Sequence, residues 1–449
     1  MLEKKKWHGV WRCVNVLLAF AQAKQAGLAG VRRRTAGRSK VVRSVADADF
    51  VRRQNRGLIL STLRREGAMS RTQLAGATGL SHASISAIGS ELIGRSILVD
   101  AGEPATAIDG KSRGRPAVQI WFNHHACHAV IVELDVNRAR LSLVDYAGTL
   151  VDRIESPVTP TLFADISPSA FLIEQIDRLR ARSPEVRATL RRIAISVQGI
   201  LDRSGDRLKW SPIAHVSGES IVTPLERAFG CTVSLTKRGR LLAEGARVLY
   251  PDLRDLVIAT VFIGSTVAMG LSHPGRSTQG DEGATEFGHM NHLPDGARCR
   301  CGMRGCIEAY AADYGVLRTA YGVPDQAPPA ATVPLAAYQE LVHLGLTGRR
   351  NVVHAFNLAG RAIGYGLARL MTITPPSHVL IVGPGASAFE LMRGEIEAAL
   401  AASLVCRVNG VPAITAHHDE REPIFQGMLI STLSDLDQML FASPAADGR

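Results

Sequence analysis

Three of the seven cysteines fall within eight positions, as Cys299, Cys301 and Cys306, and His289 lies ten residues before the first of them. Three thiolates and one imidazole are a complete tetrahedral ligand set for zinc, with no position left open for catalysis. The number and spacing of these ligands therefore predict one structural zinc ion held by this segment.

The alternatives to a metal site are a disulfide or three unrelated thiols on a loop. A disulfide is disfavoured because Cys299 and Cys301 are too close for easy bridging and the rest of the chain looks intracellular. Gly302 and Gly305 permit the tight turns that aim two sulfurs at one ion. His292, which is also near, is a second candidate for the nitrogen ligand.

The elements that must position this segment belong to a body that begins near Asn123. Apolar strand-like runs alternate with helical stretches from there onward, and this alternation predicts an α/β body of two lobes. The expected elements are a strand–turn–strand–turn–strand start over 129–151, a helix over 170–182, and strands over 193–197, 257–263 and 379–382.

Ahead of the body, residues 50–122 have the pattern of a winged helix-turn-helix rather than of an ordinary pair of helices. The expected helices are 51–66 ended by Gly67, 71–78 ended by Gly79, and His82 to about Ile93 capped by Ser81. Small residues on the outer face of the last helix would let it sit deep in a major groove. The basic stretch 111–116 would then lie on or beside the wing.

The residues expected to contact DNA are Arg71, Ser81, His82, Ala83, Ser84, Ser86, Ala87 and Ser90 on the helices, and Lys111, Arg113 and Arg115 at the wing. The recognition helix offers no Arg or Lys before Arg95, so it cannot make bidentate contacts with guanine. We therefore expect sequence specificity to depend more on Arg113 and Arg115, which can enter a narrow minor groove, than on the recognition helix.

The positive charge is concentrated at the front of the chain. Of the net charge of +11, residues 1–46 contribute eleven Lys or Arg against one acid, Glu3. A basic head on a near-neutral body predicts a polyanion partner. Residues 1–48 are expected to be a disordered tail, an upstream extension from a misassigned start codon, or a DNA-contacting arm. Because no apolar run is long enough to cross a bilayer, we expect a cytoplasmic, nucleoid-associated protein.

Four motifs together resemble the ROK family, which comprises bacterial sugar kinases and sugar-responsive repressors. They are ThrGlyLeuSer at 78–81, GlyArgPro at 114–116, GluPheGlyHis at 286–289 and CysArgCysGlyMetArgGlyCysIleGlu at 299–308. The order of wing, body and zinc motif resembles the repressor branch of the NagC/XylR type. The resemblance covers about residues 50–435 and implies a two-lobed, actin-like (hexokinase-like) body.

The resemblance also implies site residues. His289 is favoured as the zinc-binding histidine, and Gly199, Glu286, His289 and Glu308 match the family residues that surround a sugar. Carboxylates suit this task because each can accept from two hydroxyls of one sugar. The alternative for Glu286 is a surface carboxylate or a partner of the zinc histidine.

Where the kinases of the family carry their catalytic groups, this sequence departs from the pattern. The first phosphate turn corresponds to 135–139, where Asp135 remains but the glycines are gone, and the second corresponds to 264–268, where Gly264 remains. Counted back from Ala243–Glu244, the catalytic Asn-Asp pair falls on Leu235 and Thr236. Because Thr236 cannot act as a general base, we expect no enzymatic activity.

The motifs and the resemblance together imply a DNA-binding transcriptional regulator, a repressor of carbohydrate-utilisation genes that senses a sugar or sugar derivative through a catalytically degenerate ROK domain. We expect it to bind double-stranded operator DNA as a homodimer or homotetramer. The alternatives are a ROK sugar kinase with an added head, or a DNA-binding scaffold without a ligand. The expected domains are 1–48 (tail), 49–122 (winged helix-turn-helix), 123–253 (lobe 1, completed by the C-terminal helix), 254–435 (lobe 2 with the zinc loop) and 436–449 (tail).

Overall fold

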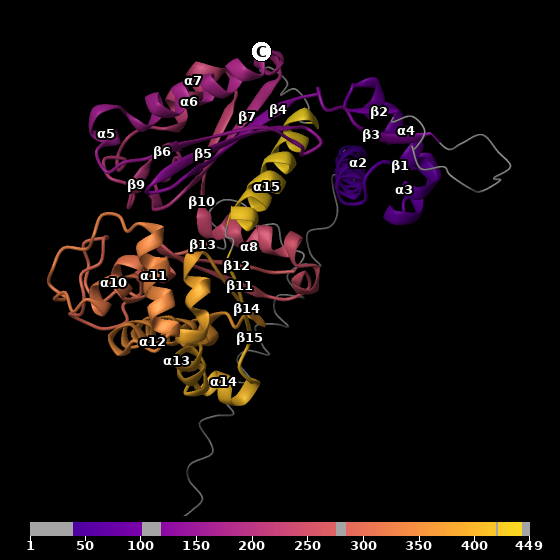
Figure 1. Ribbon diagram of the computed structural model, residues 1–449. Helices are drawn as coiled ribbons and strands as arrows, with labels where there is room; N and C mark the ends of the chain where they lie inside the picture. The colour runs from indigo at the N-terminus through magenta and orange to yellow at the C-terminus, as the bar shows by residue number, and fades with distance from the viewer. Residues whose placement is uncertain (1–38, 101–117, 275–283, 419–420, 442–449) are drawn as a thin grey trace, which may run out of the picture. The chain divides into compact units, whose positions relative to one another are not determined.

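The structure is a computed structural model that describes residues 39–100, 118–274, 284–418 and 421–441. It divides into two compact units, Met1–Gly67 with Arg71–Ile88, and Ala68–Ser70 with Gly89–Arg449 (Figure 1). Within the described ranges, none of the helices combines the length and the hydropathy that a membrane span requires.

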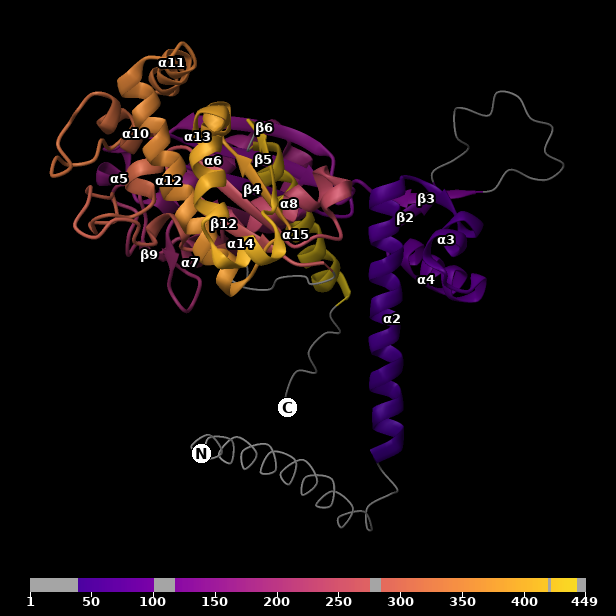
Figure 2. The same cartoon turned by 90° about the horizontal axis from the view of Figure 1, so that it is seen from below.

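The first unit is helical, and α2 is a single long helix within it (Figure 2). Its elements are α2 (Ser39–Glu66), α3 (Arg71–Thr78) and the first turns of α4 (His82–Gly94). Four side chains with no exposed surface, Ile59, Leu63, Leu74 and Ile85, lie in this unit. Their burial supplies the apolar free energy that short helices need in order to persist.

The helix α2 begins at Ser39 rather than at Val51, so residues 39–48, expected to be part of a disordered tail, are helical. No glycine or proline interrupts the sequence between Gly37 and Gly57. Once a helix is nucleated, each added residue contributes a hydrogen bond, so it extends until a breaker stops it.

Three short strands, which lie between and after these helices in the sequence, form a small antiparallel sheet. Its strands are β1 (Met69–Ser70), β2 (Leu98–Asp100) and β3 (Gln119–Phe122), in the order β1-β3-β2. A winged helix-turn-helix has the same order of elements, with its helices followed by a hairpin such as β2–β3. The hairpin connection with Lys111, Arg113 and Arg115 lies outside the described residues.

The second unit contains two five-stranded sheets of the same topology (Figure 1). In each, an antiparallel meander of three strands is extended by two parallel strands. The first sheet has the order β10-β7-β4-β5-β6 and consists of β4 (His128–Leu134), β5 (Arg138–Asp145), β6 (Leu150–Pro157), β7 (Leu190–Val197) and β10 (Thr232–Lys237). The second has the order β13-β12-β11-β14-β15 and consists of β11 (Ile258–Ile263), β12 (Val267–Ser272), β13 (Ala284–Thr285), β14 (His378–Val382) and β15 (Ala413–His417).

Helices and short turns cover these sheets. In the first lobe they are α5 (Leu162–Asp165), α6 (Pro168–Arg182), η1 (Pro184–Ala188) and α7 (Val222–Phe229), with a hairpin of β8 (Ile200–Leu201) and β9 (Leu208–Trp210). The next helix, α8 (Arg238–Leu249), packs on β12 and β11 of the second sheet and is followed by η2 (Pro251–Leu253). In the second lobe the helices and turns are η3 (Phe287–His289), α9 (Glu308–Ala311), α10 (Asp313–Ala320), α11 (Leu335–Leu346), α12 (Arg350–Ile373), η4 (Pro384–Ala388), α13 (Phe389–Ala401) and α14 (Leu404–Asn409). The last helix, α15 (Arg421–Phe441), returns to pack against α8, β4 and β7 (Figure 1).

Each lobe has its own apolar core. The core of the first lobe gathers side chains from one face of its sheet, at alternate positions of β4, β5, β7 and β10, and from α6 and α7. The core of the second lobe includes Cys299 and Cys306, which are 3% and 2% exposed. The cysteine-rich segment is therefore packed into the second lobe rather than carried on a free loop.

Candidate functional site

The cysteine-rich segment brings four possible metal ligands together. One ligand atom each of His289, Cys299, Cys301 and Cys306 lies within 4.8 Å of the others. The sulfurs of Cys301 and Cys306 are 3.7 Å apart, and Nδ1 of His289 lies 3.7 Å from the sulfur of Cys299. His292 stands outside this group and packs against the ring of Tyr310.

These separations fit one tetrahedral zinc ion. Ligand sulfurs at about 2.3 Å from zinc would lie about 3.8 Å apart at the tetrahedral angle, and a sulfur and a nitrogen about 3.6 Å apart. Gly305, at a φ of 73°, makes the turn between the last two thiols, and a side chain there would meet the carbonyl oxygen of Leu293. The backbone thus requires glycine at this point in order to aim both sulfurs inward.

Glu308 links this cluster to the neighbouring cavity. Its Oε1 lies 3.5 Å from the sulfur of Cys299 and accepts from the hydroxyl of Tyr314 at 3.3 Å, and its Oε2 accepts from the amide of Val267 at 3.2 Å. Burial, assisted by the negative charge of Cys299, raises the pKa of Glu308 to about 7. Both oxygens of this carboxylate therefore already have partners in the protein.

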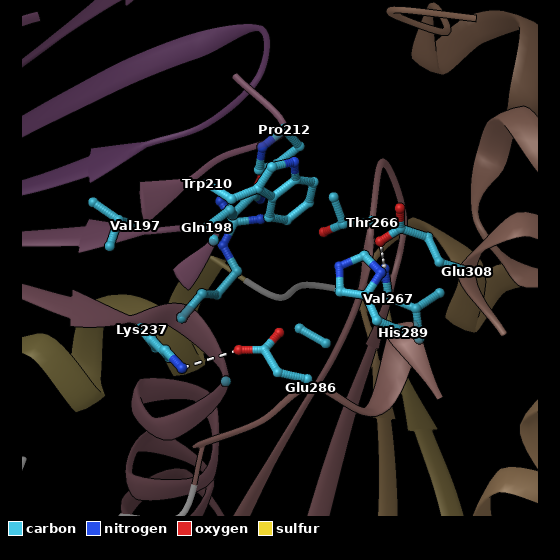
Figure 3. Close-up of a pocket in the computed structure, with 14 residues that line it drawn as sticks. Val197, Gln198, Trp210, Pro212, Lys237, Thr266, Val267, Glu286, His289 and Glu308 are labelled. Carbon is cyan, nitrogen blue, oxygen red and sulfur yellow. Dashed lines mark hydrogen bonds and ion pairs between the residues drawn. The ribbon is translucent and has the colours of Figure 1, made fainter. Parts of the chain in front are cut away.

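The four residues that the resemblance assigned to a sugar line one cavity between the lobes. Gly199 comes from the end of β7, and Glu286, His289 and Glu308 come from the second lobe (Figure 3). A side chain at Gly199, whose φ is 130°, would meet the carbonyl oxygen of Trp210, so glycine lets the β9 segment approach the cavity. Trp210 in turn places its ring edge-to-face against His289, with centroids 5.1 Å apart.

An ion pair closes this cavity. The ammonium of Lys237, at the end of β10, lies 3.0 Å from Oε1 of Glu286 and so joins the ends of the two sheets (Figure 3). The remaining volume is about 50 Å³, whereas sites for small ligands typically measure about 300–1,000 Å³. A sugar can enter only if Lys237 and Glu286 separate or the lobes open.

A second ion pair lies deeper, between Arg238 and Asp135. One guanidinium nitrogen of Arg238 is 2.9 Å from Oδ2 of Asp135, and both side chains are less than a tenth exposed. The other oxygen of Asp135 accepts from the amide of Val136 and from Gln198. Burial alone would raise the pKa of Asp135, but the charge and hydrogen bond of Arg238 outweigh it and hold that pKa below its ordinary value.

The expectation that Leu235 and Thr236 occupy the catalytic position needs correction. Leu235 is buried in the core of the first lobe, and Thr236 lines a different groove, beside α8 and α15. The residues of this segment that line the cavity are Lys237, Arg238 and Gly239. Because β10 ends at Lys237 and α8 begins at Arg238, the side chains that reach the cavity come from the junction of strand and helix rather than from the strand before it.

Both phosphate-turn segments line a second cavity of about 440 Å³. Asn137 and Arg138 come from the first turn, and Gly264 and Ser265 come from the second. Asp135 lines this cavity while Arg238 lines the first one, so their ion pair stands between the two.

The expected DNA-contacting residues on the helices are mostly exposed. Ser81, His82, Ala83, Ser86, Ala87 and Ser90 are exposed, whereas Arg71 and Ser84 are half-buried. The hydroxyl of Ser81 accepts from the amide of Ser84 at 3.1 Å and so caps α4. Because Ile85 and Ile88 are buried, α4 presents one apolar face and one face of small side chains.

Two sheets of one topology around a shared cavity define the actin-like, two-lobed class of proteins. The ROK family domain matches residues 130–431, more than half of the sequence, and the chain belongs to the ROK family.

Two curated relatives of the chain are transcriptional regulators. The xylose repressor of Bacillus subtilis is 24% identical over 344 residues, which cover 75% of this chain and 84% of that protein. The transcriptional dual regulator NagC of Escherichia coli is 23% identical over 388 residues, which cover 85% and 93%. The match to NagC thus extends well beyond the ROK domain itself.

Solved structures share the fold. A ROK family transcriptional regulator, a homologue of the E. coli MLC protein, superposes with a TM-score of 0.67 at 20% identity, covering 87% of this chain and 98% of that one. A ROK glucokinase from Streptomyces griseus with glucose and AMPPNP gives 0.52 at 18% identity, covering 68% and 98%. The expected α/β, actin-like body is therefore confirmed.

The lining residues that the sequence does not predict include Gln198, Trp210, Lys237 and Arg238. Lys237 and Arg238 directly follow the positions that were counted as the catalytic pair, and their charge was a usable signal. Gln198 precedes Gly199, but nothing in its local pattern distinguishes it.

Proposed function

We propose that the chain is a DNA-binding transcriptional repressor of carbohydrate-utilisation genes, whose ROK body senses a sugar or sugar derivative. The main support for this proposal is that α4, which precedes the ROK domain in the sequence, has an exposed face of small residues. A capped helix with small outer residues can approach base edges closely. The similarity to the xylose repressor and to NagC supports the same reading.

The proposal includes partners and a compartment. One winged head would read a short half-site, so we propose a homodimer or homotetramer on double-stranded operator DNA. Lys111, Arg113 and Arg115 would contribute wing contacts to phosphates or a minor groove. Such a regulator works where the DNA is, which in a bacterium is the cytoplasm.

Zinc, held by His289, Cys299, Cys301 and Cys306, is proposed as a structural ion. Four ligands fill a tetrahedron, so the ion would hold the segment before α9 in place without taking part in chemistry. Glu308 starts α9 and lines the cavity. The metal site would thereby fix one wall of the sugar site.

Replacing Ala87 by glutamate should weaken DNA binding by at least about 100-fold, because a carboxylate would enter a surface lined by phosphates and like-charge contacts cost several kcal/mol. Ala87 is exposed, so folding should be unchanged. The matched control is Ala398→Glu, which places the same change on an exposed position of α13 in the body. Fluorescence anisotropy with labelled duplex DNA at one salt concentration measures both. Equal affinities for the two variants would show that α4 is not the recognition helix.

The second candidate function is a sugar kinase, because the cleft contains two neighbouring cavities, as an enzyme with two substrates would require. A phosphoryl group would have to pass from the larger cavity to the smaller one, where the Asp135–Arg238 pair stands. A guanidinium has no lone pair with which to take a proton from a sugar hydroxyl, and both oxygens of the Asp135 carboxylate are already bound, by Arg238 and by Val136 and Gln198. We therefore propose that the body has no kinase activity.

A coupled ATP assay across pentoses, hexoses and N-acetylhexosamines should stay at the level of the protein-free control. A ROK glucokinase run in parallel provides the positive control. Sugar-dependent turnover of about one per second or more, which is typical of enzymes, would refute the loss of activity.

A further inference from the structure

Several buried polar atoms of the cavity have no hydrogen-bond partner among the described residues. They are Nε and Nη1 of Arg238, Oε1 of Gln198 and Oγ1 of Thr266. The three side chains are 4%, 6% and 6% exposed, and all three line the same cavity. Buried polar groups are nearly always satisfied, so unsatisfied ones gathered at one cavity indicate a ligand that completes them.

The charge of these groups indicates what that ligand carries. The guanidinium of Arg238 offers only donors, and the nitrogen that contacts Asp135 is Nη2. Two other nitrogens of Arg238, Nε and Nη1, have no partner among the described residues, and Lys237 lines the same cavity. Charge-assisted hydrogen bonds from a guanidinium to acid oxygens are shorter and stronger than those to neutral hydroxyls.

We propose that the effector is an anionic sugar derivative, a sugar acid or sugar phosphate, whose acid group binds Arg238 and Lys237. This inference rests on the proposed ligand-sensing function of the cavity. The hydroxyls of the ligand would donate to Glu286 and to Oε1 of Gln198, which both accept.

Lys237 and Glu286 then act as a pair that the ligand separates. They bind each other across the cavity at 3.0 Å. An anion at Lys237 and hydroxyls at Glu286 replace that contact with two contacts to the ligand. Both oxygens of Glu308 already accept from or contact other groups, so Glu286 is the carboxylate released for hydroxyls. A neutral sugar can supply hydroxyls to Glu286 but has no anionic group for Lys237.

The test is calorimetric titration of the full chain with matched ligand sets. Each set contains a neutral sugar, the corresponding sugar acid and the corresponding sugar phosphate, for example glucose, glucuronate and glucose 6-phosphate. Further sets are built in the same way on xylose and on N-acetylglucosamine. We expect one acidic member to bind at least tenfold more tightly than its neutral counterpart, with an affinity that falls as salt rises. Whether the carboxylate or the phosphate binds more tightly identifies the acid group.

Charge-removing variants test the assignment of residues. Lys237→Gln should reduce the preference for the acid over the neutral sugar at least tenfold, and Arg238→Gln should do the same. Arg238 is buried against Asp135, so its removal endangers folding. The side chain of Lys237 is partly accessible, so the Lys237→Gln variant should fold and its ligand preference decides the test. The matched control, Lys209→Gln, changes an exposed lysine of β9 that does not line the cavity and should leave the preference intact.

The outcomes separate the two proposals. Neutral sugars that bind as tightly as their acids, or a Lys237→Gln variant with an unchanged preference, would overturn the anionic ligand but leave a sugar-sensing regulator. Failure of every member of every set to bind would overturn the sensing function as well.

Discussion

Replacing Cys301 by serine should remove a stoichiometric zinc ion and destabilise the body by about 4–5 kcal/mol or more, the range reached when a metal is lost. The effect is large because Cys299 and Cys306 lie in the core of the second lobe, each about 3% exposed or less. Without the ion, one imidazole and two remaining sulfurs would stay crowded within 4.8 Å and buried. The segment that carries Glu308 would lose its anchor.

Metal analysis of protein purified without added zinc, followed by denaturant unfolding, measures this effect. Cys231→Ser is the control, because Cys231 is half-buried in the first lobe and burial raises the pKa of its thiol to about 11. That variant should keep its zinc and most of its stability. Wild-type protein that is folded and free of metal would contradict the zinc site.

Those features that depend on local spacing could be predicted from the sequence. The ligands of the proposed zinc site lie within eighteen residues, so their types and intervals are visible without knowledge of the fold. The strands over 193–197 and 379–382 were visible for a similar reason, because buried parallel strands are short apolar runs. The capped helices of the head were likewise marked by Ser81 and Gly79.

The parts that could not be predicted depend on packing between distant segments. Asp135 and Arg238 are far apart in sequence, and only the approach of α8 to the β4–β5 turn brings them together. The start of α8 is itself held against the second sheet, since a side chain on Gly270 of β12 would meet the carbonyl oxygen of Gly239 in α8. The spacing of the motif predicts Leu235 and Thr236 at the site, whereas the cations that line the cavity, Lys237 and Arg238, lie two positions further along the chain.

The closed cavity has a consequence for regulation. The Lys237–Glu286 pair joins the ends of the two sheets, so a ligand that separates it favours a different arrangement of the lobes. A ligand shifts such an equilibrium only through its different affinities for the two arrangements. In a dimer, a change of lobe angle would alter the spacing of the DNA-binding heads and so the fit to two half-sites.

Operator release is therefore the second large effect that we expect. Saturating amounts of the tightest sugar ligand should lower the affinity of the full chain for its operator by about 5- to 150-fold, the range of typical allosteric coupling. The reciprocal effect must also hold, so operator DNA should weaken binding of the ligand by the same factor. No ATP should be required, because the ligand acts by binding alone.

The most direct test of a sugar-responsive repressor is fluorescence anisotropy on a duplex that the full chain has itself selected from a random pool. The affinity is measured at one fixed salt concentration with and without the ligand, since salt alone changes DNA affinity steeply. The account predicts sequence-specific binding that the ligand weakens at least fivefold in the absence of ATP. Failure to select any sequence, or an operator affinity that no bound ligand changes, would contradict it.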